Sequence, residues 1–433
     1  MPIRRDHSLP LTPDVVFPAR IDHQGRLSID DKQGDVTSMG TATWLLEVTY
    51  HAGGRWKLPG VTTAENGQIR FTQYFECNET GKRLLNLTGI HSFDAIKLRK
   101  VHCTLDREMR LLGFKRPPLE DGPLMIIAPH PDDAELAAFG LYQHYAKNTW
   151  IVTLTAGETL KRLDKQYLPQ LDDDLGVACR RKGHIRTWNS ATTPLLAGVP
   201  AEQLVMLGYF NDTLSAMLAE PDKEIPSHGA SGISVSDFRR WNHKPLASDQ
   251  SPAINCGNHL LADLTALLDD IRPTTLVVTH PDIDPHKDHQ AAASWLAQAM
   301  AQSQHQPQRV LLYANHLKGV RGFPRGPVFA AAGLWPVAAN RQGLLSSRIF
   351  SEPLDTEAIR EKAVAMDSMH DLRARTRLDK ALKQWLAWRL SGLPKSTRAS
   401  FGEHDYFRTH LKAQENFTEV TAETFMSHLN QQA

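Results

Sequence analysis

In the first part of the chain, up to about residue 115, apolar and polar positions alternate over short runs. Residues 41–50, 68–75 and 95–101 are interpreted as strands, and residues 68–75 show the alternation typical of a strand with one buried face. Glycine-containing turns separate the runs, and no helical spacing of apolar residues occurs among them. The pattern predicts a β-rich, sandwich-like domain over residues 1–118.

From Leu124 onward, nearly continuous apolar runs alternate with stretches of helical spacing. The apolar runs, interpreted as strands, are residues 124–128, 151–155, 204–207, 275–279 and 310–313. Leucines with helical spacing, such as Leu260, Leu264 and Leu268, precede the fourth run. Apolar runs without alternation fit parallel strands that are covered on both faces. The pattern therefore predicts a Rossmann-like, doubly wound α/β fold with a mainly parallel sheet.

Proline and glycine residues indicate where the β-rich domain ends and the α/β domain begins. Residues 116–123 carry three prolines and a glycine and are interpreted as a linker. The α/β domain is predicted to span residues 122–370, with a polar insertion at about 220–257. Residues 371–433 are expected to form a helical extension, since residues 378–390 show helical spacing.

Composition narrows the function classes. Apolar residues make up 41% and charged residues 22% of the chain, so an ordered globular protein is expected. The formal net charge of +1 gives no electrostatic reason to expect a nucleic-acid partner. No signal peptide is expected at the N-terminus, and no apolar run is long enough for an integral membrane segment. Peripheral contact with a membrane and the oligomeric state stay open.

Cysteine usage indicates the redox compartment. The four cysteines are scattered and form no C-x-x-C pair, so free thiols are expected rather than disulfides or a cysteine-based zinc site. They are Cys77, Cys103, Cys179 and Cys256. This usage predicts a reducing compartment, and we expect a cytoplasmic protein.

Two clusters of ionisable residues follow apolar runs that are far apart in the sequence. Residues 130–133, with one histidine and two aspartates, come after the first predicted strand of the α/β domain. Residues 280–289, with three histidines and three aspartates, come after the fourth. Imidazole nitrogens and carboxylate oxygens are usual ligands of zinc and other divalent ions. Ligands of doubly wound sheets bind beyond the carboxyl ends of strands, so the clusters are predicted to form one metal site.

The residue types suggest how such a site would react. A catalytic zinc ion has three protein ligands, which His130, Asp133 and His289 would supply, and an open position for water. Because zinc lowers the pKa of that water to about 7, Asp132 can accept the proton as general base. His286 could stabilise an oxyanion or protonate a leaving amine. The reaction class is hydrolysis of an amide or ester, with zinc as the expected cofactor and other divalent ions as alternatives.

Each cluster alone has a simpler interpretation. The first could be a turn that caps a helix, since aspartate is common at helix N-termini. The histidines of the second could be exposed turn residues. His280, Asp282 and Asp284 fit the surroundings of a site or a loop better than the ligand set. The coincidence of both clusters at strand ends of one domain favours the metal site.

At these residues the chain resembles the PIG-L/LmbE-like family of zinc-dependent de-N-acetylases. The family includes the N-acetylglucosaminyl-phosphatidylinositol deacetylase. Its motif (A/P)-H-P-D-D-x-E is matched by residues 129–135, and its motif H-x-D-H by residues 286–289. The resemblance covers roughly residues 122–370 and implies an LmbE-like fold and de-N-acetylase activity.

The resemblance also implies roles for individual residues. It implies the same zinc ligands, which are His130, Asp133 and His289. Asp132 would be the general base. His286 would act as oxyanion stabiliser or general acid, oriented by Asp288.

Three further residues are implied to bind the substrate. Glu158 ends a Thr-x-Gly-Glu turn after the second predicted strand of the α/β domain. Arg180 resembles the family's substrate-binding arginine, although the usual R-x-x-E is incomplete here, so Arg181 could take the role. Asp212 ends a variant of the family's L-G-Y-x-D motif with one residue inserted.

These observations predict hydrolysis of the N-acetyl group of an amino sugar in a glycan or glycolipid, which releases acetate and a free amine. A lipopolysaccharide or other cell-envelope intermediate would be such a substrate. One alternative is a metal-dependent glycosyltransferase, which would leave His130 and His289 without a role. Another is a non-catalytic glycan-binding protein that uses the β-rich segment.

Six aromatic residues of the β-rich segment bear on the last alternative. They are compatible with a carbohydrate-binding sandwich, but more simply they form its core or its interface with the α/β domain. They are Trp44, Tyr50, Trp56, Phe71, Tyr74 and Phe75.

Overall fold

The structure, a computed structural model, divides into two compact units. It describes residues 2–31, 36, 39–161, 170–171, 173–250, 253–320, 322–373, 382, 385–386, 389–390 and 405–431. Unit 1 comprises Met1–Pro117, Val320–Ala363 and Ala374–Thr418, and unit 2 comprises Pro118–Gly319, Val364–Arg373 and Glu419–Ala433. Each unit is assembled from separate segments, whereas the sequence suggested three contiguous domains. Those domain boundaries stay a prediction.

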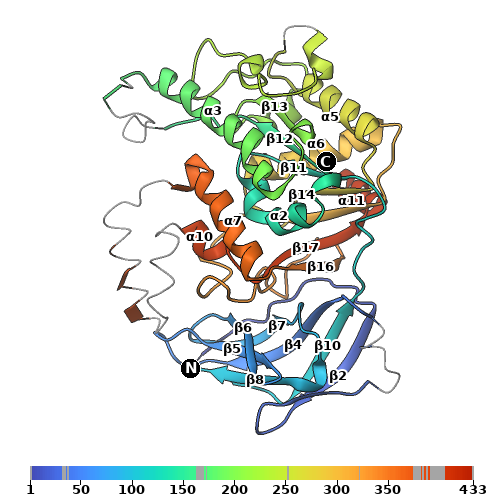
Figure 1. The fold of residues 1–433 in the computed structure, drawn as a ribbon, viewed down its shortest axis with the longest axis vertical. Helices are drawn as coiled ribbons and strands as arrows, with labels where there is room; N and C mark the ends of the chain where they lie inside the picture. Colours follow the sequence, from blue (N-terminus) through green and yellow to red (C-terminus); the bar gives the residue numbers. More distant parts are fainter. Residues whose placement is uncertain are drawn as a thin grey trace. The chain divides into compact units, whose positions relative to one another are not determined.

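Unit 1 contains two mostly antiparallel sheets (Figure 1). The larger has the strand order β1-β7-β4-β10-β2-β3, with β9 beside β4. Its strands are β1 (Ile3–Arg4), β2 (Val15–Ile21), β3 (Leu27–Ile29), β4 (Thr43–His51), β7 (Glu79–Asn86), β9 (Thr104–Leu105) and β10 (Glu108–Phe114). The smaller sheet has the order β6-β5-β8, from β5 (Gly60–Glu65), β6 (Gln68–Tyr74) and β8 (Ile96–Val101). The predicted β-rich N-terminal part is confirmed.

One hydrophobic core joins both sheets of unit 1. It brings Leu46 of β4 together with Val61 of β5 and Leu98 of β8. Four of the six aromatic residues noted in the sequence lie in this core, namely Trp44, Tyr50, Phe71 and Phe75. Trp56 differs, because it is 67% exposed. The simpler interpretation of these aromatic residues therefore holds for the buried four.

The C-terminal segment is more mixed than its expected helical character. Its described parts include helices α10 (Asp405–His410) and α11 (Ala422–Asn430), but also strand β17 (Gln414–Thr421). Phe417, Val420 and the threonines of β17 favour extended backbone, which explains the difference. Most of residues 378–390 lies outside the described residues. Unit 1 also holds β16 (Arg348–Pro353) and most of α7 (Thr356–Ser368).

Unit 2 is built on parallel strands in the order β13-β12-β11-β14-β15. They are β11 (Leu124–Ala128), β12 (Thr149–Thr155), β13 (Leu204–Tyr209), β14 (Thr275–Thr279) and β15 (Arg309–Tyr313). These are the five strands predicted from the apolar runs. Every residue of β11 and β14 is buried, as expected for strands covered on both faces. The predicted α/β fold with a mainly parallel sheet is confirmed.

Helices connect these strands in two groups. The helices are α2 (Asp133–His144), α3 (Leu175–Thr192), α4 (Leu214–Ala219), α5 (Gly257–Ile271) and α6 (Lys287–Gln302). Figure 1 shows α3 on one side of the strands and α5 and α6 on the other. The chain leaves β11 toward β12 and β13 and then returns to β14 on the opposite side of β11. The strand order therefore reverses between β11 and β14, which is where doubly wound folds bind ligands.

The described residues of the insertion at about 220–257 form turns and short 3₁₀ segments within unit 2. Arg239 fastens it, since its guanidinium donates to Asp263 Oδ2 at 2.8 Å and to the carbonyl oxygen of Leu207 at 2.7 Å. Asp263 is completely buried on α5 and also accepts a hydrogen bond from Tyr209. Among the described helices of the whole chain, none is long and apolar enough to cross a membrane.

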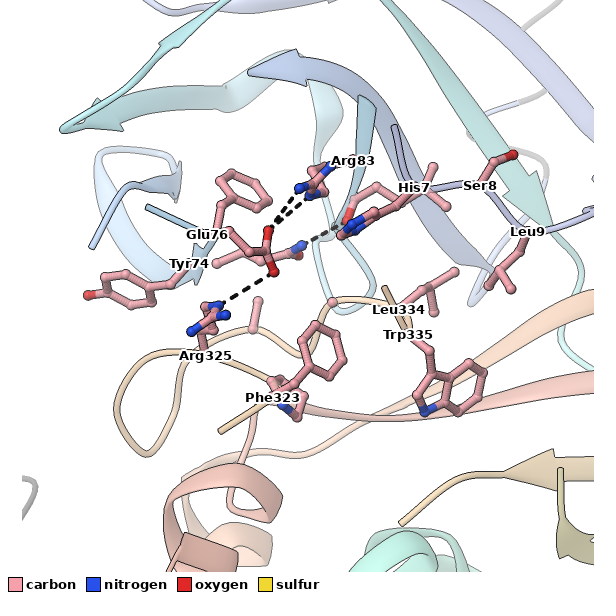
Figure 2. Close-up of a pocket in the computed structure, with 16 residues that line it drawn as sticks. His7, Ser8, Leu9, Tyr74, Glu76, Arg83, Phe323, Arg325, Leu334 and Trp335 are labelled. Atoms are coloured by element: carbon pink, nitrogen blue, oxygen red, sulfur yellow. Dashed lines mark hydrogen bonds and ion pairs between the residues drawn. The ribbon is translucent and has the colours of Figure 1, made fainter. Parts of the chain in front are cut away.

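A pocket in unit 1 holds a buried charge cluster (Figure 2). Arg83 donates to Glu76 Oε2 through Nε and Nη2, at 3.1 and 3.0 Å, and to Glu79 at 3.1 Å. Arg325 lies on the other side of Glu76, with 3.4 Å between Nε and Oε1. His7 borders the same pocket, and burial together with Arg83 lowers the pKa of its imidazole to about 4.

Candidate metal-dependent active site

The turn after β11 separates two adjacent carboxylates. Asp132 adopts a φ of 121°, a region that residues other than glycine rarely occupy, and α2 begins at the next residue. The carboxylate of Asp133 turns back, and its Oδ2 accepts from the backbone N–H of His130 at 2.9 Å. Asp132 instead faces Arg186. The two neighbouring carboxylates therefore have different partners. The uncommon φ of Asp132 lies at the candidate site, as strained backbone often does at functional sites.

Three side-chain atoms from the two sequence clusters lie close together, and we call them the donor triangle. His130 Nδ1 lies 3.2 Å from His289 Nε2, and Asp133 Oδ2 lies 3.3 Å from the first nitrogen and 3.2 Å from the second. A tetrahedral ion with ligands at about 2.0–2.1 Å has ligand–ligand separations of about 3.3–3.4 Å. All three residues are buried. The donor types and their spacing fit a divalent ion such as zinc.

Carboxylates hold both histidines of this triangle from behind. His289 Nδ1 lies 2.9 Å from Asp284 Oδ2, and His130 Nε2 lies 3.2 Å from Asp288 Oδ2. Metal-binding histidines usually make such a contact through their second nitrogen, which fixes the ring orientation. Asp284, which is fully buried, also accepts from the backbone N–H groups of His286, Asn315 and His316. Asp284 thus joins the loop after β14 to the loop after β15 beside the site.

The electrostatic field of the triangle favours positive charge. Burial opposes ionisation of Asp133, but His289 and His130 hold the pKa of its carboxyl well below the usual value. Burial also works against charged imidazoles, but the surrounding carboxylates raise the pKa of His130 to about 9 and that of His289 to about 10. The field that holds protons here also suits a metal cation, which would displace them.

Asp132 is held by an arginine that sequence reasoning missed. Arg186 of α3 donates through Nη2 to Asp132 Oδ2 at 3.0 Å and to the carbonyl oxygen of Pro131. Its Nη1 lies 3.3 Å from Asp371 Oδ2, which also pairs with Lys182 at 3.2 Å. Burial raises the pKa of Asp132 to about 7, against the opposing effect of Arg186. No sequence signal separates Arg186 from the other basic residues of this helix.

His286 borders the triangle from its more exposed side. Its ring centroid lies 5.0 Å from that of His130 and 4.7 Å from that of His289. Its Nε2 lies 3.8 Å from Asp212 Oδ1. Burial, together with His130 and His289, lowers the pKa of His286 to about 4. Asp212, predicted as a substrate contact, therefore stands beside the predicted acid.

Asp288 occupies a different place from the expected one. The sequence suggested that it orients His286, but its carboxylate lies against His130 and accepts from the N–H groups of Asp212 and Leu214. Its backbone N–H donates to His286 Nδ1 at 3.3 Å, so Asp288 contacts His286 through its main chain. Asp288 is the second residue of α6, and its carboxylate links the start of this helix to the loop that carries Asp212.

Two of the predicted substrate-binding residues lie outside the triangle. Glu158 is fully buried, and its carboxylate accepts from the N–H of Asn211 at 3.0 Å and from Ser227 Oγ at 2.7 Å. Burial raises its pKa. These contacts brace loops around the site. Arg180 donates to the carbonyl oxygens of Ser231 and Gly232 in the insertion, so its guanidinium is engaged there. Their substrate-binding roles stay predictions.

Asn315 and His316, which follow β15, complete the cluster, although sequence reasoning did not select them. Asn315 Nδ2 donates to Asp133 Oδ1 at 2.8 Å. Potential ligand atoms of Asp133, His289 and His316 lie within 4.8 Å of one another, as do those of His130, His286 and His289. The rule that found the first two clusters, polar residues directly after an apolar strand, would also have found this pair.

The site lies within a recognisable family region. Residues 125–300 match the family model described as PIG-L, GlcNAc-PI de-N-acetylase. The match includes both clusters and the strands β11 to β14. The chain therefore contains a PIG-L-family deacetylase domain, that is, a hydrolase domain that acts on amide bonds.

Solved structures give more distant similarities. N,N'-diacetylchitobiose deacetylase from Pyrococcus horikoshii is 15% identical, covers 71% of this chain and 87% of its own, and has a TM-score of 0.36. A deacetylase of the teicoplanin biosynthetic pathway is 14% identical, with coverage of 69% and 98% and a TM-score of 0.29. GalB, the 4-carboxy-2-hydroxymuconate hydratase of Pseudomonas putida, is 12% identical, with coverage of 69% and 95% and a TM-score of 0.33. No curated protein matches the chain.

Proposed function

We propose that this chain is a zinc-dependent enzyme that removes the N-acetyl group from an N-acetylated amino sugar in a glycan or glycolipid, in the cytoplasm. The observation that carries the proposal is that the two adjacent aspartates after β11 have different partners. Asp133 joins His130 and His289 in the donor triangle, whereas Asp132 stays outside it on Arg186. A hydrolase needs both a place for a metal ion and a separate base.

The metal ion would be held by His130, Asp133 and His289. When bound, zinc supplies Lewis acidity that makes water more acidic and polarises the acetyl carbonyl group. The buried carboxylates Asp284 and Asp288 keep the two imidazole rings in the orientation that this requires.

The proton transfers belong to side chains beside the triangle. Asp132 takes a proton from the water whose oxygen attacks the carbonyl carbon, while Arg186 fixes the direction of its carboxylate. His286, which its lowered pKa keeps neutral, donates a hydrogen bond to the carbonyl oxygen, with Asp212 on its other side, and Asp132 passes the proton it has taken up to the leaving nitrogen. The carbon–nitrogen bond then breaks, and acetate and a free amine are the products.

Acetate release tests the proposal. The full chain, loaded with zinc, is incubated with N-acetylated monosaccharides, oligosaccharides and a lipid-linked amino sugar, each with and without a chelator. We expect acetate and amine in equal amounts from at least one sugar, loss of release with the chelator, and recovery with added zinc. Release that survives the chelator, or acetate from O-acetylated but not N-acetylated sugars, would contradict the proposal.

A further inference from the structure

Unit 1 contains a cavity that the proposed chemistry does not use. Its volume is about 470 Å³, within the range of pockets that hold small ligands. Ile69, Arg70 and His91 line one part of it, and Phe329 and Asp355 line another. We call it the Phe329 cavity. Ile69 is 65% and Phe329 is 38% exposed, so apolar surface is open to a ligand at this point.

Phe329 has an unusual backbone for a bulky residue. Its φ is 68°, in the left-handed region that glycine and asparagine occupy most easily. Its N–H donates to the carbonyl oxygen of Leu411 at 3.1 Å, and the buried Lys412 holds the preceding loop by donating to three backbone carbonyl oxygens. The surroundings therefore impose this conformation. A strained residue that is also an exposed aromatic points to a role in binding.

The polar groups of the cavity define the chemistry of a ligand. Arg70 and Asp355 carry opposite charges, so the lining has no excess charge to attract an anion. Arg70 donates to the carbonyl oxygen of Gly89 and its Nε lies 3.5 Å from Glu65 Oε2, and Asp355 Oδ1 accepts from the N–H of Ala358 at 2.8 Å; these contacts orient both groups. His91 is exposed. Fixed planar groups beside an aromatic face suit a ligand that is apolar on one side and carries hydroxyl groups on the other.

We propose that the Phe329 cavity binds a neutral oligosaccharide. The apolar face of a sugar ring lies on Phe329 and Ile69, and its hydroxyl groups bond to Arg70, His91 and Asp355. The choice of a sugar rests in part on the proposed function, because a glycan-processing enzyme meets this ligand. The site belongs to unit 1 and is separate from the residues that carry the chemistry.

Binding of neutral trisaccharides tests this site. The probes are cellotriose, maltotriose and N-acetylchitotriose, and the protein is the full chain with Asp132→Asn to prevent turnover. Calorimetry and ligand-observed magnetic resonance measure binding. We expect at least one probe to bind, and Phe329→Ala and Phe329→Gly to weaken it by roughly tenfold or more, as for aromatic anchors of binding sites. Trp56→Ala, at an exposed aromatic of unit 1 outside the cavity, is the matched control and should leave affinity unchanged.

A stability measurement tests the strain separately. At an ordinary position glycine destabilises relative to alanine, but at a positive φ the order reverses. We therefore expect the Phe329→Gly variant to unfold at a temperature about 2–4 °C above that of Phe329→Ala. The same affinity in wild-type and both Phe329 variants, or tighter binding of a sulfated trisaccharide than of the neutral ones, would overturn the proposal.

Acetate release separates this proposal from the proposed function. The Phe329→Gly enzyme with intact Asp132 should release acetate from an N-acetylated monosaccharide at the wild-type rate. Loss of trisaccharide binding with that rate retained supports the cavity. Trisaccharide binding that depends on Phe329 in a protein that releases acetate from no sugar would support the cavity and overturn only the enzymatic proposal.

Discussion

Two buried clusters of ionisable side chains in this protein have opposite chemical capacities. In unit 1, Glu76 lies between Arg83 and Arg325, and each contact joins an N–H donor to a carboxylate oxygen (Figure 2). In unit 2, His130, His289 and Asp133 direct lone pairs toward one point at separations of 3.2–3.3 Å. In the first cluster, arginine N–H groups and carboxylate oxygens pair with one another. In the second, protons or a metal cation must lie between the three facing atoms.

The histidines of the two clusters make the same contrast. Burial and Arg83 lower the pKa of His7 to about 4. The imidazoles of His130 and His289 are buried more deeply, but the carboxylates around them raise their pKa values to about 9 and 10. His7 is therefore kept neutral, whereas His130 and His289 favour a positive charge; His286, which borders the second cluster, is kept neutral like His7. The comparison shows which kind of buried ionisable cluster indicates a metal site. Its facing atoms are nitrogens and oxygens that can offer lone pairs to a cation, not N–H groups already bonded to carboxylates.

Removal of two ligands should have the largest effect. In a His130→Ala/His289→Ala variant we expect bound zinc to fall from about one ion per chain to near zero, because two of three donors are lost. Elemental analysis of dialysed protein measures it, with the exposed pair His228→Ala/His243→Ala as control. Retention of zinc at the wild-type level would refute the shared site.

Loss of the base should leave the metal in place. We expect Asp132→Asn to lower kcat by about 10²- to 10⁴-fold, the range typical of a general base. Zinc content should be unchanged, since Asp132 Oδ2 contacts Arg186 rather than the triangle. Acetate release and elemental analysis on the same samples check both points, with the exposed Asp222→Asn as control. Full activity would remove Asp132 from the mechanism.

The charge cluster around Arg83 in unit 1 should affect the stability of the protein and not its metal binding. Replacing Arg83 by methionine leaves Glu76 with Arg325 and Glu79 with Arg5 as their remaining partners, so we expect the free energy of unfolding to fall by at most about 3–5 kcal/mol. Arg110→Met breaks an exposed pair with Glu47 and should cost at most about 1 kcal/mol. Urea unfolding measures both. A change of zinc affinity in the folded Arg83 variant would contradict the separation of roles.

The carboxylate behind His289 should tune metal affinity. We expect Asp284→Asn to weaken zinc binding by about 10- to 100-fold, as is usual for groups that orient a metal-binding histidine. Competition with a chromophoric chelator gives the affinity. Asp269→Asn, which removes a carboxylate hydrogen-bonded to Ser303 on the same unit, is the control. Equal affinities in both variants would exclude this role for Asp284.

The smallest effect concerns the neutral histidine of unit 1. Because the folded-state pKa of His7 lies below the unfolded value, the unfolded chain binds more protons between pH 6.5 and 4, so stability is lost as the pH falls. Because solvent screens the partly exposed imidazole, this amounts to less than about 2 kcal/mol from pH 7 to pH 5. Urea unfolding of wild-type and His7→Gln should show a shallower pH dependence in the variant. Identical slopes would show that His7 is not kept neutral.

The sequence predicted much of unit 2 because its signals are local. Each strand is a continuous apolar run, and the motifs around His130 and His289 lie directly after two of them. Unit 1 was predicted only in part. Residues 320–363 and part of the C-terminal region join it through contacts that no periodicity reveals. Strand β17 was missed because its two apolar residues, Phe417 and Val420, stand three positions apart and do not alternate with polar ones.

The sequence by itself determined the donor types, the base candidate and the two strand ends that carry them. Only the tertiary structure decided the partners: Arg186 beside Asp132, the Asp288 carboxylate behind His130, and Asn315 with His316 as a third contribution. The physical reason is distance along the chain. Short-range periodicity determines which residues follow the end of a strand. Hydrogen bonds between side chains depend instead on which strands, far apart in the sequence, become neighbours in the sheet.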